Sequence, residues 1–175
     1  MTRTPPKARR SLRLVPALLV VATKRNEMPG KSLSDISEAM RDIDFCMLST
    51  HAASGRIAAR PMSNNREVDY DGDSYFFACD SAHSIGEIDA NPNVGLTYHA
   101  KDHLLGRPGI FLSIEGKAKL IRDKTQFQKH WTEGLDRWFK QGVDTGGLVL
   151  IEVHADKLHY WDGENEGEVD LRVRA

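Results

Sequence analysis

The 175-residue sequence predicts a mainly β protein, an antiparallel barrel or sandwich with short helices at its ends. Roughly seven short apolar or alternating segments are separated by turn residues, which is typical of antiparallel β structure. Only two or three short stretches have the apolar spacing of a helix. Strands and helices do not alternate as parallel βαβ units require. The length fits one domain.

The first 30 residues differ from the rest and are left out of the fold argument. They begin with Pro- and Arg-rich sequence, and residues 14–22 form an apolar run too short to span a bilayer. A basic stretch before such a run is typical of a secretory signal, but Lys24-Arg25 follows at once and no small-x-small cleavage pattern is present. We expect residues 1–30 to be a disordered tail or a translated stretch upstream of a start at Met28, with a signal as the alternative. The folded domain is expected over residues 31–175.

The first helix is predicted over Ser34–Asp42. Ser32 and Asp35 have the spacing of a helix start, and apolar residues then recur at helical intervals. An apolar run over Phe45–Thr50 predicts a strand, and alternation over Ile57–Pro61 predicts another. The proline favours a strand end or a sheet edge.

The next segment begins with Tyr70-Asp-Gly-Asp73, which is a strong hairpin signal because Asp-Gly supplies the positive φ of a tight turn. It predicts a hairpin that joins a strand before Tyr70 to a strand over Ser74–Cys79. A short helix is expected over Ser84–Ala90, where Asn91-Pro92 ends it. A further strand is expected over Val94–His99.

The remaining elements are three strands and a helix. Apolar and polar residues alternate over Ile110–Leu120, which predicts a long strand with one buried face. Residues Lys124–Trp131 have a helical pattern. Two closing strands are expected over Leu148–Val153 and Leu158–Trp161, with a turn between them.

Charge and cysteine content exclude several function classes. Seven of the 24 basic residues and one of the 25 acidic residues precede Met28, so the rest of the chain has a net charge of −7. A body this acidic lacks the basic surface that a nucleic-acid backbone requires. Cys46 and Cys79 do not form a disulfide framework, and the histidine spacings match no metal motif. We expect a cytoplasmic protein without a metal and with neither nucleic acid nor membrane as a partner.

Three groups of residues are candidates for chemistry. Arg60, at the end of its strand, can offer a forked donor to phosphate, although a solvent-facing arginine is the commoner case. The turn Asp80–Ser84 leads into a helix whose first amides, with His83, can hold an anion; Asp80 or Ser81 can equally be an ordinary cap. Aromatic residues near Trp138 and Trp161 can flank a flat ring, or simply pack in a core.

The order of these segments resembles the flavin-binding split-barrel superfamily of pyridoxamine-phosphate-oxidase-like proteins, with the general-stress-protein branch as the best match. The resemblance covers residues 34–163. Its pieces, in family order, are the first helix with Phe45–Thr50, Gly55–Met62, Tyr75–Phe77, the helix ending at Asn91–Val94, Ser113–Gly116, Trp138-Phe139-x-x-Gly142 and Tyr160-Trp161.

The resemblance implies a six-stranded antiparallel split β-barrel of Greek-key type, a homodimer, and flavin mononucleotide (FMN) at the dimer interface. It matches Arg60, His83 and Ser84 to phosphate contacts, and places the strand backbones along the flavin ring. Trp138 and Phe139 match a loop that walls the cleft, and Trp161 matches a tryptophan brought by the second subunit. The full set of cofactor-binding residues is Arg60, Pro61, Met62, Ser63, Phe77, Ala78, His83, Ser84, Trp138, Phe139 and Trp161.

Two departures from the family pattern narrow the expected function. Ser84 stands where many members have lysine, so one cation for the phosphate is missing. The acidic stretch Asp162–Glu168 replaces arginines that true oxidases use for a phosphorylated vitamin, and it would repel such a substrate. We therefore expect a flavin-binding general stress protein, with FMN or FAD as ligand. A flavin-dependent oxidoreductase of another substrate, whose catalytic residues are unknown, is the alternative; a flavin-free dimeric interaction module is the third hypothesis.

Overall fold

The computed structural model describes residues 30–64, 66–101, 109–163 and 165–171. The predicted N-terminal extension, up to residue 29, lies outside them. The elements in chain order are α1 (Leu33–Met40), β1 (Phe45–His51), β2 (Ile57–Ser63), β3 (Asp73–Cys79), α2 (His83–Ala90), β4 (Asn93–His99), β5 (Phe111–Ile121), α3 (Lys124–His130), two 3₁₀ turns η1 (Glu133–Leu135) and η2 (Gly142–Asp144), β6 (Leu148–Asp162) and β7 (Asn165–Val169).

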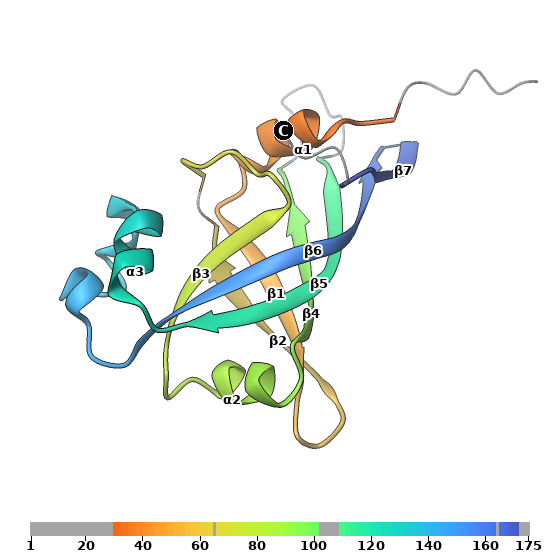
Figure 1. Ribbon diagram of the computed structural model, residues 1–175. Helices are drawn as coiled ribbons and strands as arrows, with labels where there is room; N and C mark the ends of the chain where they lie inside the picture. The colour runs from red at the N-terminus through yellow and green to blue at the C-terminus, as the bar shows by residue number, and fades with distance from the viewer. Residues whose placement is uncertain (1–29, 65, 102–108, 164, 172–175) are drawn as a thin grey trace, which may run out of the picture.

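All the strands belong to one antiparallel sheet. Six of them follow one pairing path in the order β2-β1-β4-β5-β6-β3, and β7 pairs with β6 off this path. Figure 1 shows that the sheet is strongly curled, with β3, β5 and β6 in front of β1 and β2. The sheet is not closed, because β2 and β3 end the path without pairing to each other. The prediction of a mainly β antiparallel fold is confirmed; the described residues form seven strands in an open sheet, whereas the resemblance implied a six-stranded barrel.

Alternating burial along the strands defines the main core. In β1, Cys46, Leu48 and Thr50 are buried while the residues between them face outward. The same alternation occurs in β4 and β5, and it places Leu96, Leu112 and their neighbours inside the curled sheet.

Helix α1 is capped by Ser32, whose side chain forms a capping box with Asp35 as predicted. Helix α2 packs against β1 and β5 at one end of the barrel (Figure 1).

A second apolar cluster lies on the outer face of β3 and β6. Phe77 and Leu150 are buried there under Phe127 of α3. The segment that follows α3 completes the cluster with Trp131 and Phe139. This cluster fixes the position of the loop that contains Trp138, so it determines the shape of the neighbouring surface.

Strand β6 is continuous, so the prediction of two closing strands separated by a turn is wrong. The polar residues His154, Asp156 and Lys157 interrupt the apolar pattern, and a β-bulge lies there. Glu115 pairs with Lys157 and Gly116 with Ala155, so Asp156 is the extra residue on β6. The short strand β7, which pairs with the end of β6, was not predicted from its acidic sequence.

The predicted local hairpin at Tyr70–Asp73 is also wrong. Gly72 has the expected positive φ of 110°. However, β3 pairs with Leu148–His154 of β6, about 75 residues away in the chain, rather than with a strand just before the turn. The residues immediately before Tyr70 are polar, whereas β6 offers a continuous apolar run, so the non-local partner is favoured.

The bulge generates a stability prediction. A Cβ at Gly116 would lie 2.2 Å from the backbone oxygen of His154, whereas a Cβ at Gly86 in α2 would meet nothing within 4 Å. We expect Gly116→Ala to lower the free energy of unfolding by about 1–3 kcal/mol, because the backbone at His154 or Gly116 must move to make room for the Cβ. The control Gly86→Ala is expected to raise it by about 0.5–1 kcal/mol, as in other helix interiors. Urea denaturation of both variants measures the difference, and equal stabilities would contradict the role of the bulge.

Candidate functional site

A cleft of about 520 Å³ lies where the two ends of the sheet face each other. One side is formed by the end of β2, with Pro61, Met62 and Ser63, and the other by Tyr75–Phe77 of β3. The segment after α3 closes the third side with Trp138 and Phe139. The cleft therefore brings together residues from three separate parts of the sequence.

The wall beside β3 is aromatic. Phe77 makes edge contacts with Trp131 and Phe139, with ring centroids 5.0 Å and 6.5 Å apart. Trp138 extends this wall but is 58% exposed, as expected for a residue at the mouth of a cleft. Flat apolar walls next to a strand edge suit a planar ring system, since the rings supply contact area and the strand supplies backbone donors and acceptors.

His130 and Tyr75 also line the cleft, and neither was predicted as a site residue. Their rings are stacked 3.8 Å apart. Burial is the main cause that lowers the pKa of His130, and the nearby Lys129 acts in the same direction. Burial also raises the pKa of Tyr75 to about 12, and the carboxylates of Asp73 and Glu152 add to this effect. The cleft thus contains a neutral imidazole and a neutral phenol at pH 7.

Arginines surround the mouth of the cleft. Arg41 is paired with Asp69, and Arg66 Nη1 lies 3.0 Å from Asp44 Oδ1. Arg137 stacks over Trp138, with its guanidinium carbon 5.3 Å from the ring centroid. These residues lie in polar stretches that show no pattern in the sequence, so only the fold reveals that they share a site.

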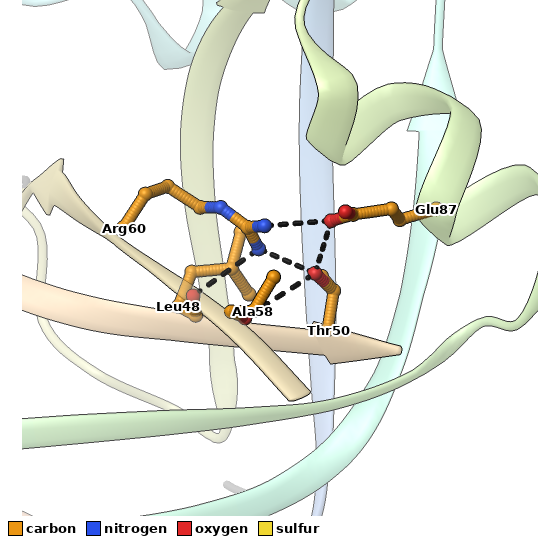
Figure 2. Close-up of polar contacts among 5 residues, drawn as sticks. All are labelled: Leu48, Thr50, Ala58, Arg60 and Glu87. Carbon is orange, nitrogen blue, oxygen red and sulfur yellow. Dashed lines mark hydrogen bonds and ion pairs between the residues drawn. The ribbon is translucent and has the colours of Figure 1, made fainter. Parts of the chain in front are cut away.

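Arg60 points away from the cleft, to the inner side of β2 at the α2 end of the barrel. Its Nη2 lies 2.6 Å from Glu87 Oε2, and its Nη1 donates to Leu48 O at 3.3 Å and to Thr50 Oγ1. Figure 2 shows this network between the sheet and α2. The hydrogen bond from Thr50 is the main cause that lowers the pKa of Glu87, and Arg60 contributes to the shift. Glu87 is therefore ionised, and its charge balances that of Arg60.

The start of α2 lies next to this network. The helix begins at His83, and its N-cap residue Ala82 provides no side-chain hydrogen bond. Neither Asp80 nor Ser81 is the cap, because the cap position is Ala82, and the Asp80 carboxylate accepts from Arg122. The first turn has no acidic residue, and Ser84 is buried. Among the described residues, no side chain caps the first amides of this helix.

The predicted site residues thus fall into two neighbouring groups and two separate positions. Pro61, Met62, Ser63, Phe77, Trp138 and Phe139 line the cleft, whereas Arg60, His83 and Ser84 lie at the α2 end. Ala78 packs against the main core. Trp161 lies on the outer face of β6, where it stacks on His159 and donates from Nε1 to Glu166.

The outer face of the sheet around Trp161 is unusually apolar. Phe45, Met47, Phe111 and Trp161 are each at least 39% exposed. Phe111 pairs with both His99 and Trp161 in the sheet, so Phe111 and Trp161 share one surface. Exposed apolar area of this kind makes the face a candidate interaction surface.

Two features are absent from the described ranges of the chain. No group of three or more His, Cys, Asp or Glu side chains is arranged to hold a metal ion there. No helix in those ranges is long and apolar enough to cross a membrane.

Comparison with known proteins reveals relatives of the predicted kind. General stress protein 26 of Bacillus subtilis (strain 168) is 29% identical over 93 residues, which are 52% of this chain and 63% of that protein. The aligned part is thus less than two thirds of that relative.

Solved structures share the fold. A protein from Clostridium acetobutylicum related to general stress protein 26 has a TM-score of 0.65 at 15% identity, over 78% of this chain and 92% of that one. The general stress FMN/FAD binding protein from Xanthomonas citri has a TM-score of 0.62 at 23% identity, over 76% and 89%.

The profile of one protein family matches most of the chain, from residue 31 to residue 173. This range contains every described helix and strand. The family is the one that the ordered motifs of the sequence resemble. The chain belongs to the pyridoxamine 5'-phosphate oxidase-like family.

Proposed function

We propose that this chain is a flavin-binding general stress protein, with FMN as its ligand and FAD as the closest alternative. One observation carries the proposal: a single cleft collects six of the residues matched to the flavin site, from β2, β3 and the loop after α3. Its aromatic wall and strand edge suit the isoalloxazine ring. A similar fold in a general stress FMN/FAD binding protein supports the same ligand class. The six-strand path that stays open between β2 and β3 supports the split barrel that the resemblance implies.

The phosphate of FMN is assigned to the start of α2. Uncapped first amides and the positive end of the helix dipole favour an anion there. Arg60 lies on the adjacent strand, bound to Glu87 one helical turn beyond His83. The residues at the α2 end, which include Arg60, would thus contact the phosphate of the ligand. The cleft residues, which begin with Pro61, would contact its ring.

The functional unit is proposed to be a homodimer. The exposed apolar residues Phe45, Met47, Phe111 and Trp161 lie on one outer face of the sheet. A second copy of the chain is the occupant proposed, because the same face on two copies can pair symmetrically. Trp161 of one copy would then approach the flavin of the other. The expected cellular location stays the cytoplasm.

A flavin-dependent oxidoreductase is the second candidate, and one observation favours it. His130 and Tyr75 are stacked in the cleft, so titratable groups are present where a substrate would meet the ring. A bound flavin would supply the redox chemistry itself, and His130 would hold or release a proton at its imidazole. Anaerobic mixing with reduced nicotinamide separates the candidates: rapid bleaching of bound flavin supports the enzyme, and its absence supports the binding protein.

The ligand proposal predicts a specific effect of Arg60→Ala. We expect the affinity for FMN to fall by about 1.5–3 kcal/mol, the usual contribution of a charge-assisted hydrogen bond. Riboflavin, which has the same ring but no phosphate, should bind the variant and the wild type equally. Titration followed by flavin fluorescence measures both ligands. An unchanged affinity for FMN would show that Arg60 does not contact the phosphate, and a wild-type chain that binds no flavin would favour the flavin-free module.

The dimer proposal predicts that Met47→Asp separates the subunits. Met47 is 41% exposed on the proposed interface, and a carboxylate buried there without a partner costs about 3–5 kcal/mol. The dimer dissociation constant should rise at least about a hundredfold. Val68→Asp is the matched control, because Val68 is 48% exposed but lies in the loop before β3. Light scattering during gel filtration compares the masses; two dimeric variants, or a monomeric wild type, would refute this interface.

A further inference from the structure

Glu87 lies in a position to determine how Arg60 presents its guanidinium. Glu87 Oε2 is 2.6 Å from Arg60 Nη2 and 2.5 Å from Thr50 Oγ1 (Figure 2). The Thr50 hydroxyl donates to Glu87 and accepts from Arg60 Nη1. Thr50 is fully buried, and both charged side chains are mostly shielded from solvent. These three side chains therefore form one connected unit between the sheet and α2.

The unit uses one edge of the guanidinium and leaves another edge free. Nη1 donates both its hydrogens, to Leu48 O and to Thr50 Oγ1, and Nη2 donates one to Glu87. The two acceptor oxygens on Thr50 and Glu87 are themselves hydrogen-bonded, so they lie side by side along the Nη1–Nη2 edge. Of the five donors of an arginine, the Nε–H and the second Nη2–H have no acceptor among the described residues. These two donors share the Nε edge.

A free Nε edge is the geometry that binds two oxygens of one phosphate or carboxylate group. A free arginine side chain would rotate among several rotamers, and holding it costs conformational entropy. Glu87 and Thr50 hold the Arg60 side chain in one rotamer in the folded protein, so its conformational entropy is lost on folding and not on ligand binding. The carboxylate also opposes the ligand, because it cancels the charge of Arg60 next to a dianion.

We infer that Glu87 is a positioning residue that makes Arg60 selective for a phosphate monoester, so that the chain distinguishes FMN from riboflavin. The inference rests on the proposed flavin site. At this site, the preference for FMN over riboflavin comes from the fixed orientation of the two free N–H donors of Arg60 and not from a net positive charge. Glu87 does not contact the phosphate; it acts through Arg60.

Two substitutions at Glu87 separate orientation from charge. Glu87→Gln removes the charge but keeps an acceptor oxygen for Arg60 and Thr50, whereas Glu87→Ala removes both. Asp89→Asn is the matched control, since it removes one carboxylate from the exposed side of the same helix. The measured quantity is the ratio of the FMN and riboflavin affinities for each protein, from fluorescence titration.

We expect the Asp89→Asn ratio to equal that of the wild type and the Glu87→Gln ratio to equal or exceed it. The Glu87→Ala ratio should be at least tenfold lower than the Glu87→Gln ratio. Equal ratios for the two Glu87 variants, or a higher ratio for Glu87→Ala, would show that Glu87 acts only as a charge that competes for Arg60, and would overturn the inference. A wild-type chain that binds both flavins equally would instead overturn the phosphate site itself.

A second measurement does not depend on flavin. In ¹⁵N-labelled protein, the Arg60 Nε–H should give a sharp resonance that inorganic phosphate shifts. Glu87→Ala should broaden this resonance, while Glu87→Gln restores it. A resonance that is equally sharp in both variants would show that Thr50 and Leu48 suffice to hold Arg60, and would also overturn the role of Glu87. Thermal melting of each variant shows whether the fold is retained.

Discussion

The architecture depends on the bend in strand β6. Its first half, Leu148–His154, pairs with β3, and its last residues pair with β7, while β5 follows both halves. The bulge at Asp156 opposite Gly116 lies between these halves and changes the direction of the strand. A straight β6 would keep β3 and β2 at opposite edges of a flat sheet. Because β6 bends, the sheet curls until its two end strands face each other, and the cleft forms between them (Figure 1).

Strand β2 lies at the open edge of the sheet and contributes residues both to the α2 end and to the cleft. β2 is an edge strand, so Pro61 interrupts no ladder on its free side. Successive side chains of a strand point to opposite faces. Arg60 points inward to the α2 end, as its pairing with buried Leu48 requires, and Met62, the next residue on that face, lines the cleft together with Pro61 and Ser63. A change of register by one residue would turn Arg60 to the opposite face of the sheet, away from Glu87.

The sequence predicts the elements well where the pattern is local. The capping box of α1, the alternation in β5 and the helix that ends at Asn91 were all found within a few residues of their bounds. Sequence patterns do not predict which strands pair when the partners are far apart in the chain. The turn at Gly72 has the predicted backbone, but its strand pairs with distant β6. The sequence at residues 154–157 predicts a turn because the bulge interrupts the two-residue alternation of apolar and polar side chains that identifies a strand.

Candidate site residues follow the same division. Pro61–Ser63, Phe77 and Trp138 were identified through motifs that lie in order along the chain, and the fold places them in one cleft. His130 and Arg137 have no local signal, because they depend on how the segment after α3 packs on Phe77. The Glu87 partner of Arg60 lies 27 residues further on, across a helix–sheet contact that no spacing rule predicts.

The charge balance at the α2 end limits what the proposed site can do. Ser84 supplies no charge at the start of α2, and Glu87 cancels the charge of Arg60. A dianionic phosphate would therefore meet oriented donors and helix amides without a net positive charge. Most of the binding free energy for a flavin would then have to come from the ring, through the aromatic wall at Phe77 and Phe139. The proposed site would then hold flavin less firmly than one with paired cations, which would suit a protein that takes up and releases flavin better than one that keeps a permanent cofactor.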